Sequence, residues 1–459
     1  MFKFRSLIKL VLGALFCFVA TCGEVSCARG IDGGRPNLIL ILADDLGYGD
    51  LSCHGSSEVR TPNLDRLAAS GVMMTRMRAN CTVCSPTRAA LLTGIYPDRA
   101  GVPGVIRTDG GNSWGFFDPG QPTLADRLFK AGYHTALIGK WHLGLETPNT
   151  PCERGFQHFH GFLGDMMDDY YTHRRQGKNY MRLDSQRIDP EGHASELFTK
   201  WAIEYLEGEH RDTKKPFFLY LAYNAPHFPI QPPEAWERDT RSRFPELPEA
   251  RVKNIAFVEH LDSEVGRLLD RMEQLGLRQN TVIAFTSDNG GSLAHAQNND
   301  PWRGGKQSHY DGGLRVPGFL SYPPQIEAGI KNDQPVLTFD LAATFLSYAG
   351  VKIPDNFDAI DLRDILAGQR TLEQRELYFV RREGGPTYGG KAYQAIIQGK
   401  WKLMQNDPYS PLELYDLEND PGESQNVIAT HPQIAMRLQK QLALHIQRGG
   451  QTRWQRQAE

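Results

Sequence analysis

The chain has 459 residues, of which 40% are hydrophobic and 23% are charged, as in an ordinary soluble globular protein. This length exceeds that of a small disulfide-stabilised scaffold and leaves room for two domains, or three. The formal net charge is −3, so the sequence lacks the basic excess of a nonspecific nucleic-acid binder and predicts no nucleic-acid partner.

The first residues predict a signal peptide over residues 1–28. Basic residues up to Lys9 precede an apolar run over residues 10–20, and small residues ending at Ala28 suit a signal peptidase. The apolar run is too short for a comfortable membrane span, which ranks an uncleaved anchor second. We therefore expect an exported protein, periplasmic or secreted, with no stable membrane span.

Apolar segments that each end in a polar cluster predict buried strands. These segments cover residues 37–42, 135–139, 217–223 and 281–286. Capping residues or apolar residues at helical spacing predict helices over residues 61–70, 122–131 and 249–275. Strands that alternate with helices predict an α/β fold with a large doubly wound, mostly parallel mixed sheet flanked by helices. Ligands bind such sheets at the carboxyl ends of the strands, where the polar clusters lie.

The pattern changes after residue 369 to short strand candidates separated by turns rich in Gly, Pro and Asn. The candidates cover residues 376–381, 393–398, 401–404 and 413–415, and a helix is predicted from residue 431 to about residue 446. We therefore expect an α/β domain over residues 29–369. A smaller C-terminal subdomain, an antiparallel sheet plus a helix, is expected over residues 370–459.

Two polar pairs, Asp44 with Asp45 and Asp288 with Asn289, follow two of the predicted strands. Three crowded carboxylates repel one another unless a cation joins them. A set of oxygen ligands suits Ca²⁺ or Mg²⁺ and not Zn²⁺. Either pair alone would more often only cap a turn, but two pairs at two strand ends favour a metal site.

Cys84 begins the segment Cys-Ser-Pro-Thr-Arg, which predicts the first turn of a helix because Pro86 fits there. Backbone N–H groups at a helix start favour an anion, and Arg88 lies one turn further along the same face. A lone cysteine in an exported protein would more often be buried or disulfide-bonded. Cleavage after residue 28 leaves Cys53, Cys81, Cys84 and Cys152, whose pairing stays open.

The segment from Cys84 to Gly94 closely resembles the signature of the sulfatase family, in which C-x-P-x-R precedes a small-residue helix and T-G. Further motifs of the family occur in order: DDLGYGD from Asp44, GKWHLG from Gly139, APH from Ala225, TSDNG from Thr286 and RGGK from Arg303. The resemblance runs from about residue 35 into the C-terminal region. It is strongest to the arylsulfatase A-like, calcium-dependent type and implies the fold of the alkaline phosphatase superfamily. Asp311 stands where many relatives have Glu.

The resemblance also implies a modified nucleophile. A formylglycine-generating or radical sulfatase-maturating enzyme would oxidise Cys84 to formylglycine, whose hydrate attacks sulfur. His142 would act as the base that releases sulfate, and His227 would protonate the leaving alcohol with help from Lys306. The implied catalytic residues are Cys84, Arg88, Lys140, His142, His227 and Lys306. The implied metal ligands are Asp44, Asp45, Cys84, Asp288 and Asn289, with Ca²⁺ preferred over Mg²⁺.

These motifs predict an exported sulfatase that hydrolyses a sulfate ester of a carbohydrate, such as a sulfated polysaccharide, oligosaccharide or glycosaminoglycan. Two alternatives remain: a phosphodiester or phosphonate ester hydrolase of the same superfamily, and a sulfated-glycan binding protein with an unconverted Cys84. A single glycosylation sequon, at Asn80, favours a bacterial enzyme over a lysosomal one. Loop residues such as Arg107, Arg175 and Trp302 would suit contacts with a sulfated sugar.

Overall fold

The computed structural model describes residues 34–109, 112–372, 374–383 and 392–455. Contacts divide the chain into two units, Met1–Gly34 and Arg35–Glu459, and every element described below belongs to the second unit. The predicted signal peptide lies outside the described residues, and the predicted domain boundary at residue 369 stays a prediction. Among the helices of the described part, none has the length and apolar character needed to cross a bilayer.

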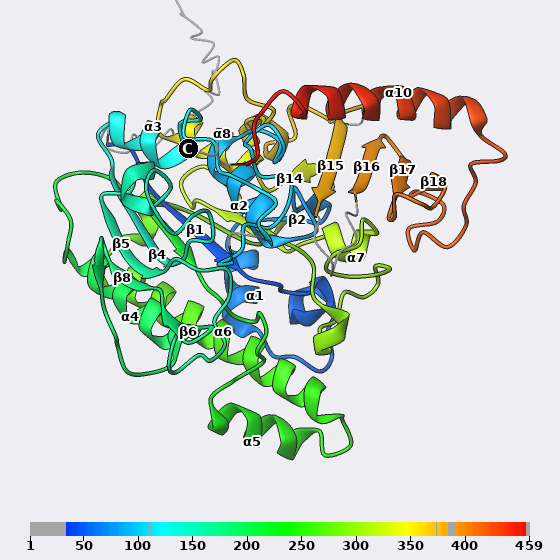
Figure 1. Ribbon diagram of the computed structural model, residues 1–459. Coiled ribbons are helices and arrows are strands. Elements are labelled where there is room, and N and C mark those ends of the chain that lie inside the picture. Colours follow the sequence, from blue (N-terminus) through cyan, green and yellow to red (C-terminus); the bar gives the residue numbers. More distant parts are fainter. Residues whose placement is uncertain (1–33, 110–111, 373, 384–391, 456–459) are drawn as a thin grey trace, which may run out of the picture. The chain divides into compact units, whose positions relative to one another are not determined.

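A ten-stranded sheet lies at the centre of the second unit (Figure 1). Its strand order is β13-β2-β12-β11-β1-β10-β4-β5-β8-β9, and the five strands from β11 to β5 are parallel. The strands are β1 (Asn37–Ala43), β2 (Val72–Met74), β4 (His134–Lys140), β5 (His158–Phe162), β8 (Met181–Leu183), β9 (Gln186–Arg187), β10 (Phe217–Ala222), β11 (Thr281–Ser287), β12 (Gly318–Ser321) and β13 (Ile330–Asn332). Two small pairs complete the set: β3 (Met77–Arg78) with β14 (Val336–Leu337), and β6 (Arg174–Arg175) with β7 (Lys178–Asn179). The predicted mixed, mostly parallel sheet is confirmed.

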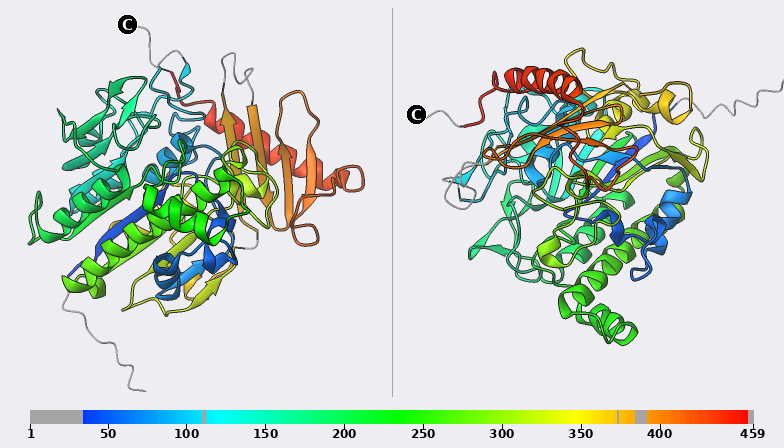
Figure 2. Two further views of the ribbon diagram at one scale, coloured as in Figure 1. Left: turned by 90° about the horizontal axis from the view of Figure 1, so that it is seen from below. Right: turned by 90° about the vertical axis from the view of Figure 1, so that its right-hand side faces the viewer.

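Helices cover both faces of this sheet. The sequence of β1 is apolar throughout because its side chains are buried on both faces. Ile39 and Ile41 pack with side chains of α1, α4 and α6, whereas Leu38 and Leu40 pack with side chains of α2, α3 and α8. The left view of Figure 2 shows α4 and α6 along one face of the sheet. The helices of the α/β part are α1 (Pro62–Ala69), α2 (Cys84–Thr93), α3 (Leu124–Lys130), α4 (Ala194–Glu207), α5 (Glu234–Arg243), α6 (Glu249–Gln274), α7 (Asp311–Leu314), α8 (Asp340–Tyr348) and α9 (Arg363–Leu366).

The start of α1 differs in one respect from the sequence prediction. The helix begins at Pro62, as expected, but the hydroxyl of Thr61 makes no capping bond to the helix backbone. The carboxylate of Asp262, on α6, instead accepts the N–H groups of Asn63 at 3.2 Å and Leu64 at 2.7 Å. The cap is therefore a tertiary contact between two helices, which local sequence cannot reveal.

The C-terminal part forms the predicted antiparallel sheet with a helix. Strands β15 (Glu376–Arg382), β16 (Ala392–Gln398), β17 (Trp401–Gln405) and β18 (Glu413–Asp416) pair in sequence order, and α10 (Pro432–Gly449) contacts β16 and β17 (Figure 1). Its apolar side chains share one core with Ala90 of α2 and Ala343 of α8. The small sheet is thereby packed against the helix that carries Cys84.

A buried cluster of charges joins α7 to the C-terminal sheet. The carboxylate of Asp311 binds Arg78 at 2.6 Å, Arg315 at 2.9 Å and Lys402 at 3.0 Å, and Lys402 also binds Glu423 at 2.7 Å. Burial alone would raise the pKa of Asp311, but Arg78, Lys402 and Arg315 hold it well below its usual value. Asp311 is therefore a structural ion-pair partner.

Replacement of Lys402 by Met should lower the free energy of unfolding by about 3–5 kcal/mol, because it leaves the buried carboxylate of Glu423 without its cation. Lys400→Met is the matched control, since the ion pair of Lys400 with Asp416 lies at the surface and contributes little to stability. Denaturant unfolding of both variants measures the difference. Equal losses would contradict the assigned role of the buried cluster.

His193 caps α4 with a neutral imidazole ring. Its Nδ1 accepts the N–H of Ser195 at 3.2 Å, and its Nε2–H donates to the carbonyl of Gln231 at 3.0 Å. Burial and the neighbouring His260 lower the pKa of His193 to about 4. Protonation would remove the lone pair that accepts the capping bond, so the folded state favours the neutral ring.

We expect His193 to make the protein less stable as the pH falls from 6.5 to about 4. In this window the unfolded chain binds a proton at His193 and the folded chain does not, so stability rises with pH, by about 3 kcal/mol in total. His193→Asn keeps a capping side chain that does not titrate. Urea unfolding across this pH range should show a shallower slope for the variant and similar stability at pH 8. Identical slopes would disprove this assignment.

Candidate active site

Parallel neighbouring strands bring the predicted polar residues to one edge of the sheet. Strands β11, β1, β10 and β4 are adjacent, so their carboxyl ends lie side by side. The residues at these ends are Asp44 and Asp45 after β1, Asp288 and Asn289 after β11, His227 after β10, and Lys140 and His142 at the end of β4. Apart from His227, all are almost fully buried.

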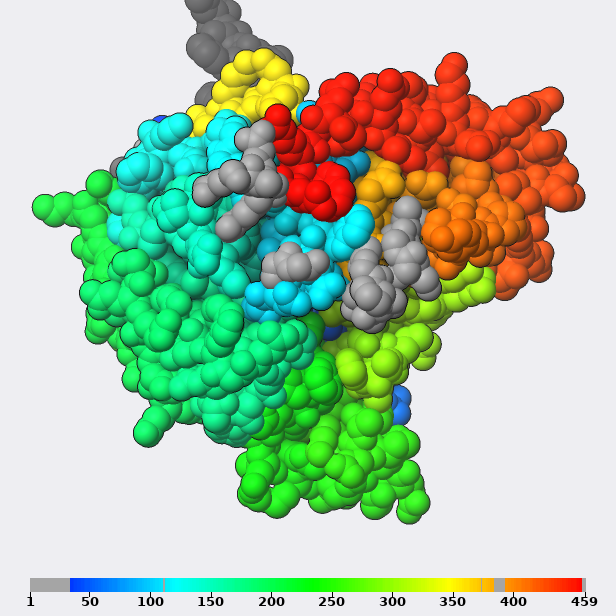
Figure 3. Space-filling view, viewed as in Figure 1, coloured from blue at the N-terminus to red at the C-terminus, as the bar shows by residue number. Residues whose placement is uncertain are grey.

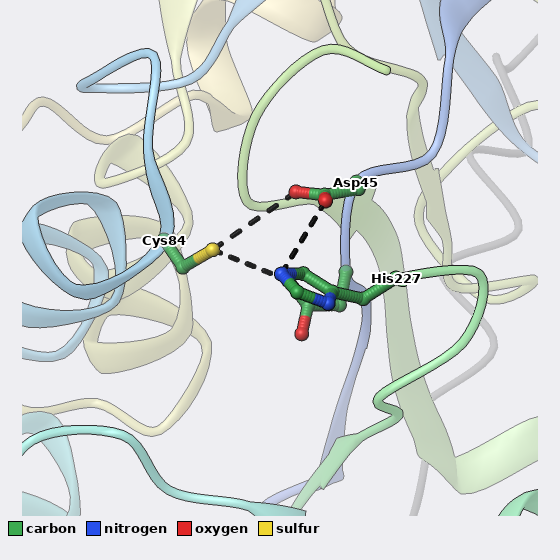
Figure 4. A group of neighbouring side chains, drawn as sticks. Asp45, Cys84 and His227 are labelled. Carbon is green, nitrogen blue, oxygen red and sulfur yellow. Dashed lines mark hydrogen bonds and ion pairs between the residues drawn. The ribbon is translucent and has the colours of Figure 1, made fainter. Parts of the chain in front are cut away.

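Cys84 is the first residue of α2 and points into this cluster. Its Sγ lies 3.3 Å from Asp44 Oδ1, 4.0 Å from Asp45 Oδ1 and 3.7 Å from the Nζ of Lys306. Figure 4 shows the sulfur directed toward the carboxylate of Asp45 and the ring of His227. Burial, followed by the charges of the neighbouring carboxylates, raises the pKa of the thiol well above its usual value. An unmodified Cys84 is therefore a protonated, weak nucleophile.

Two fixed cations neutralise the carboxylates beside Cys84. Arg88, one turn along α2, binds Asp288 Oδ2 through Nε at 2.9 Å and Nη2 at 2.8 Å. The ammonium group of Lys140 contacts Asp44 Oδ2. Burial would raise the pKa of Asp44, but Lys140, His227 and Arg88 hold it well below its usual value, so this carboxylate stays ionised.

The donor set suits a hard cation. One ligand atom each from Asp44, Asp45, Cys84 and His227 lies within 4.8 Å of the others. Asn289 adds a stronger sign: its Nδ2 donates to Asp45 Oδ1 at 2.7 Å, while its Oδ1 is buried and has no hydrogen-bond partner among the described residues. A cation at this place would satisfy that orphaned oxygen.

Both carboxylate oxygens of Asp288, like those of Asp44 and Asp45, already have partners in the chain. In Asp288, Oδ2 is bound by Arg88, and Oδ1 accepts the N–H of Asp45 at 3.2 Å. Burial and the nearby charge of Asp44 raise the pKa of Asp288 to about 7. A divalent cation would stabilise its ionised form, as it would for the whole carboxylate group.

The two predicted catalytic histidines are held in defined orientations. The Nε2–H of His142 donates to the carbonyl of Ile106 at 2.8 Å, and its Nδ1 is buried without a partner among the described residues. Burial, then Lys140 and Arg88, keep the pKa of His142 well below its usual value, so Nδ1 carries a free lone pair as a base requires. His227 donates from Nδ1 to the carbonyl of Phe228 at 2.6 Å and places Nε2 3.5 Å from Asp45 Oδ2.

Asp45 and His142 share an uncommon backbone conformation, with φ of 64° in each. Left-handed residues other than glycine are costly and persist where the surrounding structure enforces them. Each residue lies two positions after the end of a strand of the central sheet, β1 or β4. The sharp turns at these strand ends aim the two side chains into the site.

A pocket of about 300 Å³ opens above Cys84. In Figure 3 the surface is hollowed where cyan and green segments meet the yellow-green segment. The lining includes the predicted residues Cys84, His142, His227 and Lys306, and also Asp45, Arg107 and Arg175. Trp302 is not part of this lining, and the guanidinium of Arg315 lies 4.4 Å from its ring centre. A sugar contact at Trp302 stays a prediction.

Some lining residues could not be found from sequence motifs. Arg381 and Glu383 come from β15 and the residue after its end, and Glu383 binds Arg107 at 2.8 Å. Phe228 and His295 also line the pocket. Only Phe228 had a signal, because it follows the predicted catalytic His227 directly. The C-terminal sheet therefore contributes to the pocket as well as to the fold.

The fold and the site together define a hydrolase of the alkaline phosphatase-like class, with an anion site at a helix start beside acidic strand ends. The family model described as sulfatase matches residues 36–351. A second model, described as N-sulphoglucosamine sulphohydrolase, C-terminal, matches residues 304–448. The chain belongs to the sulfatase family and is a sulfuric ester hydrolase.

Individual relatives agree with this assignment. N-acetylgalactosamine-6-sulfatase of Mus musculus is 31% identical, over 87% of this chain and 78% of the relative. Arylsulfatase A of Homo sapiens is 30% identical, over 92% of this chain and 89% of the relative. The crystal structure of Ps i-CgsB in complex with k-i-k-neocarrahexaose has a TM-score of 0.84 and 29% identity, over 92% of this chain and 95% of that chain.

Proposed function

We propose that this sulfatase is an exported enzyme that removes a sulfate ester from a carbohydrate, using formylglycine formed from Cys84 and a bound Ca²⁺. The observation that carries this proposal is the position of Cys84, which lies at a helix start among three carboxylates, Arg88 and Lys306. The relatives with sugar-derived names and the saccharide in the Ps i-CgsB structure support a carbohydrate substrate.

The modified residue would supply a hydroxyl nucleophile and, after sulfuryl transfer, an exit route for sulfate. Ca²⁺ would be held by Asp44, Asp45, Asn289 and Asp288 and would supply positive charge beside a sulfate oxygen. Residues of the chain bind the sulfate group and transfer the protons.

Lys140 and Lys306 offer positive charge to the sulfate oxygens and hold the ester in place. Burial would lower the pKa of Lys306, but Asp45 raises it above its usual range, so Lys306 keeps a proton near the leaving oxygen. His227 stands beside it, with Nε2 facing the site. As the S–O bond to the alcohol breaks, the ammonium group of Lys306 supplies the proton that the alkoxide needs. His227 shares this role in its doubly protonated form, because its Nδ1–H is bound to Phe228, and burial and Lys306 lower its pKa to about 4. His142 Nδ1 then takes the proton whose loss releases sulfate.

The reaction is tested by measuring inorganic sulfate released from a panel of sulfated sugars and polysaccharides. The protein is co-produced with a maturation enzyme, and peptide mass mapping reports the conversion of Cys84. The rate of hydrolysis of a chromogenic phosphate ester is compared with that of the matching sulfate ester. A large preference for phosphate would instead support a phosphodiester or phosphonate ester hydrolase. An unconverted thiol with no turnover would support a sulfated-glycan binding protein.

The proposed export rests on the signal peptide predicted over residues 1–28, and the surroundings of Asn80 bear on the choice between a bacterial and a lysosomal enzyme. The Oδ1 of Asn80 accepts from the Thr338 hydroxyl at 2.8 Å and from the Phe339 N–H at 3.0 Å, and the side chain is fully buried. A glycan at Asn80 is incompatible with this fold, which agrees with a bacterial, periplasmic or secreted enzyme. N-terminal sequencing of the exported protein tests the proposal, and the mature chain should begin after Ala28.

A further inference from the structure

Phe228 and His295 form a stacked pair at the edge of the active-site pocket. Their ring centres lie 4.6 Å apart with an angle of 18° between the planes, and both residues line the pocket. Phe228 is 45% exposed. We call these two residues the rim pair. Neither has a role in the mechanism described above.

The rim pair belongs to a small apolar area beside a polar pocket. Leu293 begins the 3-10 helix Leu293–His295, two positions before His295, and is 58% exposed. Burial of a large apolar side chain is favourable by about 1.5–3 kcal/mol. Exposed apolar side chains at a binding pocket therefore suit an amphipathic ligand.

The orientation of His227 fixes which part of the substrate meets the rim pair. The carbonyl of Phe228 accepts the Nδ1–H of His227 at 2.6 Å, so the ring of His227 presents Nε2 to the reacting group. The alcohol oxygen that receives the proton must lie next to His227 and Lys306. His227 and Phe228 line the same pocket, so a carbon skeleton that fills this pocket can contact the Phe228 ring.

Part of the pocket lining is polar and charge-paired. Arg107 binds Glu383 at 2.8 Å, and Arg175 binds Asp165 at 2.9 Å. A lining that combines aromatic rings with hydrogen-bonding groups suits a pyranose ring, which has a face of C–H groups and a rim of hydroxyl groups.

We propose that Phe228 and His295 are specificity-determining residues that stack against the pyranose ring bearing the sulfate ester. This inference rests on the proposed carbohydrate function and adds the residues that recognise the leaving group. The rim pair contributes to binding of the sugar and takes no part in bond cleavage. It therefore affects the KM for a saccharide and leaves binding of free sulfate unchanged.

The test compares Phe228→Ala with Phe129→Ala, a control at an aromatic residue of similar exposure (48%) on α3, outside the pocket lining. The probes are N-acetylgalactosamine 6-sulfate, a sulfated carrageenan oligosaccharide, and inorganic sulfate as a competitive inhibitor. Phe228→Ala should raise the saccharide KM about tenfold, the scale of one aromatic stacking contact, with the inhibition constant of sulfate unchanged. Phe228→Tyr should restore the KM, and His295→Ala should reproduce part of the loss.

Each result bears on the proposal. An unchanged saccharide KM in Phe228→Ala would overturn the stacking role while leaving the carbohydrate function intact. A tenfold rise in the sulfate inhibition constant would also overturn it, because Phe228 would then act by holding His227. If the wild-type protein releases sulfate from an aryl sulfate but from neither saccharide probe, the carbohydrate function fails together with the stacking role.

Discussion

Cys84→Ala should lower the rate of sulfate release by about 10⁴-fold or more and leave the fold intact. Alanine has no functional group that an enzyme could convert to an aldehyde, so the nucleophile disappears. The remaining residues still bind the ester, which predicts an unchanged inhibition constant for inorganic sulfate. Turnover measured at saturating substrate, with the maturation enzyme co-produced, checks this expectation.

Cys152→Ala is the matched control, because Cys152 is exposed and lies outside the active-site pocket. Its activity should equal that of the wild-type protein. Cys84→Ser should be inactive unless the maturation system of the host accepts serine. Wild-type sulfate release by the Cys84→Ala protein would contradict the proposed mechanism.

Removal of divalent cations should have the second largest effect. A chelator selective for Ca²⁺ is expected to reduce turnover more than about 100-fold, because Asp44, Asp45 and Asp288 then repel one another and the ester loses a counter-charge. A ligand present at 100 times its dissociation constant stabilises the folded state by about 2.7 kcal/mol, so the unfolding midpoint should fall as well. Added Ca²⁺ should restore both properties, and Mg²⁺ should restore them less well.

Asn289→Ala distinguishes loss of Ca²⁺ from the proposed site from a nonspecific effect of the chelator on the protein. The variant removes the buried Oδ1 that has no partner among the described residues, so more Ca²⁺ should be needed for half-maximal activity. We expect this concentration to rise about 10-fold to 100-fold. If the Ca²⁺ dependence stays the same, Asn289 is not a ligand.

Four adjacent strands of the central sheet, β1, β4, β10 and β11, could be predicted because they are continuous apolar runs, whereas short strands such as β2 and β13 could not. The segment over residues 281–286 corresponds to β11 (Thr281–Ser287), and the helix predicted over 249–275 corresponds to α6 (Glu249–Gln274). Continuous burial on both faces leaves few alternative structures for such segments. The cap supplied to α1 by Asp262 could not be predicted, since its partner lies 198 positions away.

The active site was predictable to the extent that its residues follow strands or form a family motif. Motifs named all six catalytic candidates, and the structure brings them together, while their individual roles stay predictions. The sequence did not identify the rim pair or Glu383 as pocket residues, because their positions depend on packing between loops or with the C-terminal sheet. His227 carries two possible functions in the structure, as a proton donor and as a member of the cation-binding group.

The burial of Cys84 has a consequence for the order of events during biosynthesis. Only 3% of Cys84 is exposed, and Asp288, which binds Arg88 beside it, is made 200 positions after Arg88. We therefore expect a maturation enzyme to act on this side chain before β11 joins the sheet. Synthesis of 200 residues at about 5–20 residues per second takes about 10–40 s, which sets the time available. The active fraction of the protein is then decided by a kinetic competition between modification of Cys84 and completion of the central sheet.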